Sequence, residues 1–349
     1  MNPFVTMILF SSLGLGTALA FSSSHWLMAW MGLEINTLAI IPLMIQQHHP
    51  RAVEATTKYF LTQATAAAMI MFASTTNAWM LGEWDIQQLS NPLAANITFM
   101  ALALKIGLAP VHFWMPEVIQ GQTLIMGLII STWQKLAPFA LIIQIAPNVN
   151  PNLLVFLGIA SIFVGGWGGL NQTQLRKILA YSSIAHLGWM TLILKFAPAL
   201  TLLGLTIYII MTASAFLTFN FMHSTNIPSL AMSWTKSPTL VAIAPLVLLS
   251  LGGLPPLTGF MPKWMIIQEL TKQEIPVTAT IAALAALLSL YFYLRLCYAM
   301  SLTISPGMLT VTTSWRLHDP NPSPALAVVN IMALFLLPLS PAALALFSF

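Results

Sequence analysis

Long apolar stretches recur along the whole chain, and short polar segments separate them. A bilayer core of roughly 30 Å needs about 20 apolar helical residues, so each stretch is long enough to cross a membrane as a helix. The period-two alternation that a membrane barrel needs is absent. The pattern predicts an all-α polytopic membrane protein, with about 11 transmembrane helices in a single membrane domain over residues 1–349. The expected helices are Asn2–Phe21, Trp26–Ile45, Thr57–Trp79, Leu93–Ile119, Thr123–Gln144, Leu153–Leu170, Lys177–Phe196, Leu200–His223, Leu240–Ile267, Ile275–Leu302 and Pro324–Phe347.

Two of these stretches, 93–119 and 240–267, carry a matching interruption. Aligned from Gly107 and Gly253, both read Gly-Leu-x-Pro, then an aromatic residue, then Met-Pro. Because proline removes a backbone donor, we expect unwound backbone at both places, which a membrane tolerates only inside protein or beside a wet cavity. The two segments run in opposite directions in the expected topology, so the pattern predicts two inverted repeats, each with a broken helix. Two ordinary proline kinks are the alternative.

Composition excludes several classes of protein. Hydrophobic residues make up 58% of the chain and charged residues only 6%, whereas a soluble domain carries roughly a quarter charged residues. The formal charge of +4 is too small and too scattered for nucleic-acid binding. One cysteine, Cys297, cannot form a disulfide or a cysteine-ligated cluster within the chain, and no Gly-x-Gly-x-x-Gly follows a strand. We therefore expect no cofactor, metal or nucleotide on this chain.

Charges between the apolar stretches predict the orientation in the membrane. The segments that follow even-numbered stretches carry Arg51, Lys58, Arg176, Lys177, Lys236 and Arg316. Those that follow odd-numbered stretches carry Lys195 and Lys272 beside Glu83, Asp85, Glu269 and Glu274. The positive-inside rule places the even-numbered segments and the N-terminus in the inner compartment, and the C-terminus outside it. The start of the chain lacks a basic leader, so we expect synthesis in the compartment whose membrane it occupies.

Three charged residues lie deep in the expected helices. Glu34 is about 12 Å from the start of its stretch, and Lys105 and Lys135 are each about 18 Å from theirs. A charge at the bilayer centre costs at least about 2.5–3.5 kcal/mol, so it is normally paired, hydrated or neutral. Burial favours a neutral lysine and a nearby carboxylate favours a charged one, so a small movement of Glu34 would switch a lysine between holding and releasing a proton. A structural ion pair is the alternative, but it would account for one lysine and not for two.

Further candidates carry weaker signals. Lys263 directly follows the second interruption, where carbonyl groups and water could solvate it, although a lysine snorkelling to the interface is an alternative. His186 has Ser182 and Ser183 one turn before it on the same helical face, and His112 lies inside the first interruption. A histidine titrates near neutral pH and can pass a proton on, but each could equally be a structural histidine bonded to backbone.

Several motifs, taken in order, resemble subunit two of mitochondrial NADH:ubiquinone oxidoreductase, respiratory complex I, in its vertebrate form. The resemblance covers essentially the whole chain and implies two inverted five-helix repeats of the antiporter-like kind. It also implies that Glu34 is the family's glutamate, Lys105 the broken-helix lysine, Lys135 the central lysine and Lys263 the exit-side lysine. The motifs are Met1-Asn2-Pro3, Trp30-Met31-Gly32-Leu33-Glu34, Lys105-Ile106-Gly107-Leu108-Ala109-Pro110-Val111-His112-Phe113-Trp114, Trp133-Gln134-Lys135-Leu136-Ala137-Pro138 and Gly253-Leu254-Pro255-Pro256-Leu257-Thr258-Gly259-Phe260.

The function that the resemblance implies is proton translocation across the inner mitochondrial membrane, coupled to NADH oxidation and ubiquinone reduction on other subunits. NADH, FMN, iron–sulfur clusters and ubiquinone would belong to those subunits, and the partners would be other membrane subunits and phospholipids. The inner compartment is then the matrix, and the C-terminus lies in the intermembrane space. A stand-alone cation/proton antiporter would use the same residues, and a structural subunit that has lost transport is a third possibility.

Overall fold

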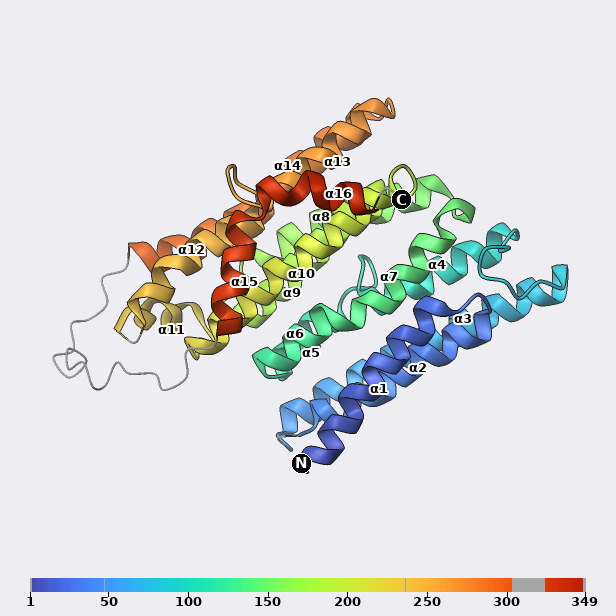
Figure 1. Cartoon of the computed structure of the whole chain (residues 1–349), viewed down its shortest axis with the longest axis horizontal. Coiled ribbons are helices and arrows are strands. Elements are labelled where there is room, and N and C mark those ends of the chain that lie inside the picture. The colour runs from blue at the N-terminus through green and yellow to red at the C-terminus, as the bar shows by residue number, and fades with distance from the viewer. Residues whose placement is uncertain (1, 47, 236, 303–323, 348–349) are drawn as a thin grey trace. The chain divides into compact units, whose positions relative to one another are not determined.

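The computed structural model describes residues 2–46, 48–235, 237–302 and 324–347, and helices dominate these ranges (Figure 1). Extended pairing within them is limited to two isolated bridges, His25 with Asp85 and Gln174 with Asn226. The chain divides into two compact units, residues 1–158 and 159–349, and each is described by itself.

The first unit contains the helices that carry Glu34, Lys105 and Lys135. Several of them begin at a capping side chain followed by proline, which is favourable at the first helical position. Asn2, His49 and Asn91 cap α1, α3 and α4 in this way, accepting a backbone N–H two residues later. The helices are α1 (Pro3–Ser22), α2 (Trp26–Met44), α3 (Pro50–Leu81), α4 (Pro92–Ile106), α5 (Trp114–Gly121), α6 (Leu124–Ser131), α7 (Trp133–Ile145), η1 (Ala146–Asn148) and the first half of α8 (Pro151–Gly169).

Close packing of α1 on α2 depends on glycine. A Cβ atom added at Gly32 would lie 2.9 Å from the carbonyl oxygen of Gly16 and 2.9 Å from the backbone nitrogen of Ala20. Small residues allow membrane helices to approach at backbone distance, where dispersion contacts are most numerous. Helix α2 also contacts α3 and α7, while α3 contacts α4 and α5. This packing brings α2, α3, α4 and α7 together around one polar region.

The second unit is built around α10 and α14. Helix α10 contacts α9, α12, α13, α15 and α16, and α14 contacts α9, α11, α12 and α13. Glycines at the end of α8 lie against these neighbours, because a Cβ at Gly165 would meet the backbone of Ala185 and one at Gly169 would meet the ring of Phe292. The elements are the second half of α8, α9 (Leu175–Ile193), α10 (Pro198–Phe221), α11 (Ile227–Ala231), η2 (Met232–Thr235), α12 (Pro238–Gly252), α13 (Phe260–Lys272), α14 (Pro276–Ser301), α15 (Pro324–Phe335), η5 (Leu337–Leu339) and α16 (Ser340–Phe347).

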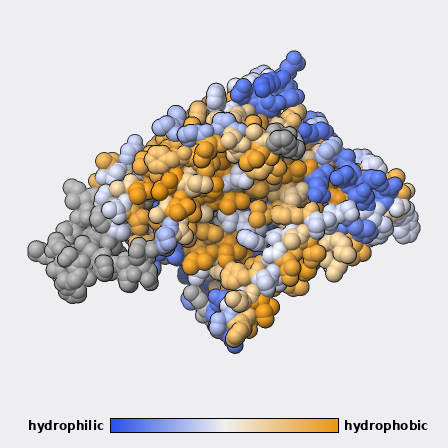
Figure 2. Space-filling view, viewed as in Figure 1, coloured by the Kyte–Doolittle hydropathy of each residue, from blue (hydrophilic) through white to orange (hydrophobic). Residues whose placement is uncertain are grey.

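The surface of the protein is that of a membrane protein. Hydrophobic side chains dominate the face seen in Figure 2, and on α1 alone Phe4, Met7 and Ile8 are each more than half exposed. By length and composition, six helices among the described residues could each cross a membrane, or up to seven if the bent pair near the C-terminus counts as one span. The all-helical, multi-pass membrane architecture is therefore confirmed, whereas the number of about 11 crossings stays a prediction.

Three of the expected helices differ from the structure in shape. Helix α3 begins at Pro50 rather than at residue 57, because His49 caps it and the polar first turns still form helix. The stretch 123–144 is interrupted at Thr132, whose hydroxyl donates to the carbonyl oxygen of Leu128 at 2.7 Å, a back-bond that bends helices. The stretch 324–347 is not straight, since its two halves bend by 67° where Pro338 and Pro341 interrupt backbone hydrogen bonding.

Two expectations remain untested. Lys236 and Arg316, which contribute to the charge bias between stretches, lie outside the described residues. The single domain over 1–349 also stays a prediction, because the internal contacts of the chain cluster into two units.

Candidate functional site

The first helix break lies between α4 and α5 and positions Lys105. Helix α4 ends because Gly107 adopts a left-handed conformation with φ of 86°, which glycine accepts without steric cost. The Gly107 N–H donates to the carbonyl oxygen of Ala103 at 2.9 Å. Across the break, the indole Nε1–H of Trp114 donates to the carbonyl oxygen of Leu104 at 3.0 Å. Lys105 therefore sits in the last turn of a half-helix whose end is fixed from both sides.

Glu34 on α2 and Lys105 on α4 form a buried ion pair. Glu34 Oε1 lies 3.8 Å from Lys105 Nζ, and the side chains are 24% and 2% exposed, respectively. Neither atom has a hydrogen-bond partner among the described residues. The other carboxylate oxygen, Oε2, accepts from the hydroxyl of Thr37 at 3.2 Å. The pair is thus close enough for strong Coulomb attraction and too long for a hydrogen bond.

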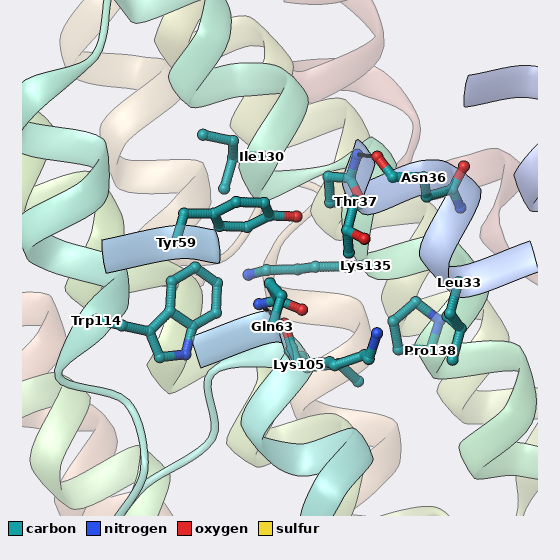
Figure 3. A pocket seen from close by; sticks show the side chains of 12 residues that line it. Leu33, Asn36, Thr37, Tyr59, Gln63, Lys105, Trp114, Ile130, Lys135 and Pro138 are labelled. Carbon is teal, nitrogen blue, oxygen red and sulfur yellow. Dashed lines mark hydrogen bonds between the residues drawn. The ribbon is translucent and has the colours of Figure 1, made fainter. Parts of the chain in front are cut away.

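A small cavity lies between Lys105 of this pair and Lys135. Its volume is about 10 Å³ for the centre of a water-sized sphere, at the lower end of the roughly 10–15 Å³ that one water needs. In Figure 3 the Lys135 amine points toward the Tyr59 and Trp114 rings, while the Lys105 amine points toward Pro138. The lining residues are Leu33, Asn36, Thr37, Tyr59, Gln63, Lys105, Ile106, Trp114, Ile130, Gln134, Lys135 and Pro138.

Lys135 reaches the cavity because α7 starts just before it. The interruption at Thr132 restarts the helix, and the Lys135 N–H donates to the Thr132 carbonyl oxygen at 3.2 Å. The Lys135 side chain is among the largest that are fully buried, with a relative exposure of 2%. The structure thus places both predicted deep lysines of the first unit on one cavity, with Glu34 paired to the first of them.

The second break, between α12 and α13, has the same backbone geometry and a different donor. Gly253 is left-handed with φ of 80°, and its N–H donates to Leu249 and Ser250. The Lys263 Nζ donates to the Gly252 carbonyl oxygen at 2.7 Å and lies 3.5 Å from the Leu251 carbonyl oxygen. These carbonyls belong to the last turn of α12, where the helix dipole is negative and attracts a cation.

The two candidate histidines lie in separate units. His112 lies in the first break, is 4% exposed, and its Nδ1 is 3.2 Å from the Pro110 carbonyl oxygen. His186 on α9 is 9% exposed, with its ring centroid 5.8 Å from that of Tyr208. Both are buried side chains with neighbours, and their roles stay predictions.

Sequence reasoning missed the neutral side chains around the cavity. Gln63 Nε2 lies 3.5 Å from the Lys105 carbonyl oxygen, and Gln134 Nε2 lies 3.4 Å from the Asn36 carbonyl oxygen. One available signal was an amide residue inside an apolar stretch, since buried polar groups need partners. Another was the spacing of Thr37, which follows Glu34 by one helical turn.

An exposed ion-pair cluster lies at the start of α3. The Lys58 Nζ is 2.7 Å from Glu54 Oε1 and 2.7 Å from Glu117 Oε2. Glu54 precedes the apolar part of α3, and its hydrogen bond with the Lys58 ammonium holds the pKa of this carboxyl below its ordinary 4.5. Among the described residues, no group of three or more His, Cys, Asp or Glu side chains is placed to hold a metal ion.

Comparison with known proteins identifies the family. Residues 23–289 match the family described as NADH:quinone oxidoreductase/Mrp antiporter, transmembrane region, and residues 290–344 match the NADH dehydrogenase subunit 2 C-terminus. The chain is 70% identical over 346 residues to NADH-ubiquinone oxidoreductase chain 2 of Oncorhynchus mykiss, covering 99% of each chain. It is 71% identical over 342 residues to the protein of the same name from Salmo salar, covering 98% of each.

Solved structures agree with these matches. A chain of respiratory complex I from Thermus thermophilus with bound aureothin is 29% identical, with a TM-score of 0.84 over 99% of this chain and 80% of that one. A chain of the archaeal membrane-bound sulfane sulfur reductase is similar in fold, with a TM-score of 0.86 at 16% identity over 97% of this chain and 74% of that one. The family matches, the curated relatives and the Thermus structure agree, and the chain belongs to the family of NADH-ubiquinone oxidoreductase chain 2.

Proposed function

We propose that this chain is a core membrane subunit of the respiratory NADH:ubiquinone oxidoreductase. In this proposal it moves protons across the inner mitochondrial membrane through Glu34, Lys105, Lys135 and Lys263. The observation that carries the proposal is the 3.8 Å distance between Glu34 and Lys105 beside a helix break. Lys135, a second buried lysine, lines the same cavity as Lys105. Relatives named NADH-ubiquinone oxidoreductase chain 2 support the enzymatic setting.

The distance between Glu34 and Lys105 suits a proton switch. Opposite charges about 4 Å apart attract by roughly 4 kcal/mol at an effective dielectric of about 20, and doubling the distance halves this. The difference of about 2 kcal/mol changes a proton equilibrium by more than tenfold. A movement of Glu34 by one side-chain length would therefore decide whether Lys105 keeps its proton. Lys135 is the proposed acceptor, and the cavity volume would admit one linking water.

The carriers outside this cavity are proposed from their own surroundings. Lys263 would serve the second repeat, where carbonyl oxygens at a helix end stabilise its ammonium form. His186 and His112 are further candidates, because both are buried and a histidine changes charge near neutral pH.

The membrane architecture is part of the proposal. Matching breaks after Gly107 and Gly253 support two inverted repeats with about 11 crossings within one antiporter-like domain. The bias of basic residues toward one set of connecting segments supports an N-terminus in the matrix and a C-terminus in the intermembrane space.

The redox chemistry is assigned to other subunits of the complex. NADH oxidation, with FMN and iron–sulfur clusters, and ubiquinone reduction would take place there, and this chain would contribute proton movement. Its partners would be neighbouring membrane subunits and phospholipids, which would cover the apolar surface that α1 exposes. The alternative of a stand-alone cation/proton antiporter predicts transport by the purified chain alone, whereas the complex-bound role predicts none.

Substitution of Lys135 tests the proposal. Lys135→Met keeps the length of the side chain and removes the proton carrier, so quinone reduction and proton uptake into vesicles should fall in a fully assembled complex. Lys135→Arg should not restore them, because a guanidinium keeps its proton at accessible pH. The matched control is Lys272→Met, since the Lys272 side chain is 61% exposed and should tolerate the same change. Normal pumping by Lys135→Met at normal complex abundance would show that Lys135 is only a structural charge.

A further inference from the structure

At both helix breaks, side chains contact carbonyl groups of the last helical turn, but the chemistry of the donors differs. A helix leaves its last four carbonyl groups without intrahelical partners, and inside a membrane protein each of them needs a donor. In both breaks the left-handed glycine donates to the carbonyls three and four positions before it. The carbonyl groups nearer to the glycine then depend on side chains.

In the first break the side-chain donors are neutral. The Trp114 indole donates at 3.0 Å to the Leu104 carbonyl oxygen, which also accepts from the Gly107 N–H. The Gln63 amide reaches the Lys105 carbonyl oxygen, two positions before the glycine, at 3.5 Å. Both donors are buried, with exposures of 8% and 4%. Neither an indole nor an amide gains or loses a proton at accessible pH. These two hydrogen-bond contacts at the end of α4 are thus independent of protonation.

In the second break the donor is a lysine. The Lys263 amine bonds the Gly252 carbonyl oxygen at 2.7 Å and lies 3.5 Å from that of Leu251. Phe260, which aligns with Trp114, has no side-chain donor. The lysine comes close because position 253 has no side chain, as a Cβ there would lie 2.9 Å from the Lys263 Cδ. A charged donor makes a hydrogen bond roughly twice as strong as a neutral one and also meets the negative end of the helix dipole.

We propose that Trp114 and Gln63 are positioning residues that hold the first break, and with it Lys105, in one geometry regardless of protonation. In the second break Lys263 holds the end of α12 firmly only while it carries its proton. The inference rests on the proposed function in one respect, because Lys263 is taken to gain and lose a proton during turnover. The second break would then loosen when Lys263 loses its proton, whereas the first break would keep its geometry.

Other titratable groups on the helices around the second break are accounted for by the test. They are Arg176, Lys177, Tyr181 and His186 on α9, Tyr208 on α10, and Tyr291, Tyr293, Arg295, Cys297 and Tyr298 on α14. On α13 itself, the Glu269 carboxylate is 3.4 Å from the Lys272 amine. A change caused by any of these groups would persist when Lys263 is replaced, whereas a change caused by Lys263 would not.

Matched cysteines in the assembled complex test the inference. Val111→Cys and Leu257→Cys occupy the same position in the two breaks, four residues after the glycine, and both positions are partly buried. Each is made with Cys297→Ser, which removes the native thiol and keeps a donor for the Pro245 carbonyl. Labelling by a small thiol reagent is measured between about pH 6 and pH 10, a range that brackets histidine and lysine titration. The result is expressed as a ratio, the labelling rate of the second-break cysteine divided by that of the first-break cysteine. This ratio cancels the general rise in thiolate with pH.

The expected result is a ratio that rises by about tenfold or more with pH, because the second break loses a hydrogen bond to a charged group. With Lys263→Arg the ratio should stay low at every pH, and with Lys263→Met it should stay high. Trp114→Phe should raise labelling of the first-break cysteine equally at every pH and lower turnover. A flat ratio in the parent complex, or the same rise with Lys263→Arg, would overturn the inference, and the parent titration decides even if a variant does not assemble. If Lys135→Met pumps normally while the labelling ratio of the parent complex still rises with pH, the proposed function is refuted. The inference about the side chains that hold the two breaks is then still supported.

Discussion

Glu34→Gln removes one charge from the buried pair while keeping the size of the side chain. At 3.8 Å from Lys105 Nζ, the lost attraction is about 4 kcal/mol at an effective dielectric of about 20. Because the Glu34 side chain is 24% exposed, water screens part of this, and about 1–3 kcal/mol is a realistic loss. That loss favours the neutral amine of Lys105 by roughly 5-fold to 150-fold.

Complex assembly should survive this change. A buried charge that loses its partner costs several kcal/mol, but a lysine can release its proton and avoid that cost. NADH-driven quinone reduction and proton uptake into vesicles, measured across pH, should show lower turnover and an alkaline limb that moves to lower pH. Complex abundance is the check on assembly.

The matched control for Glu34→Gln is Glu117→Gln. Glu117 makes a shorter ion pair, 2.7 Å from Lys58, but its side chain is 52% exposed, so water screens the pair and little free energy depends on it. Burial rather than distance should decide the outcome, and Glu117→Gln should pump like the parent. Equal turnover, pH profile and proton-to-electron ratio for Glu34→Gln and the parent would refute the reasoning.

Three further predictions follow from other parts of the structure. Gly32→Ala should lower the unfolding free energy of the chain in the assembled complex by about 1–3 kcal/mol and so lower its melting temperature. The reason is that the new methyl group would overlap the backbone of α1. The depressed pKa of Glu54 beside Lys58 means that its contribution to stability is present above pH 4.5 and lost as the pH falls through the lowered value. Parent and Glu54→Gln should therefore differ slightly at neutral pH and converge in acid, as followed by thermal unfolding at each pH. Protease accessibility in sealed membranes should place Lys177 on the matrix side, and finding it on the same side as Glu83 would overturn the proposed orientation.

The sequence was sufficient to predict helices and the location of the breaks. Apolar length determines where helices form in a bilayer, and the repeated Gly-Leu-x-Pro pattern located both breaks, where Gly107 and Gly253 adopt left-handed conformations. Depth along α2 and α4 also identified Glu34 and Lys105 as members of one site. Depth gives no information on rotation about a helix axis, however, so it did not indicate which lysine pairs with Glu34.

The neutral donors were harder to predict because their partners are backbone atoms. Gln63 contacts a carbonyl group 42 residues away in sequence, and the need for that contact exists only once α4 has ended. The interruption at Thr132 and the bend near Pro338 likewise depend on which backbone hydrogen bonds are lost. Such features follow from tertiary packing and leave little trace in hydrophobic periodicity.

The different donors at the two breaks have a consequence for how the chain is made. Helix α4 has 15 residues and α5 has 8, which at 1.5 Å per residue gives about 22 Å and 12 Å, too short to cross a bilayer alone. During synthesis from the N-terminus, Gln63 has already emerged when Gly107 ends α4, so part of that helix end can be satisfied at once. The second break must wait for Lys263, ten residues after Gly253. An insertion machine that released the nascent chain in this interval would leave bare carbonyl groups in lipid, so the second broken helix has to be sheltered until α13 is made.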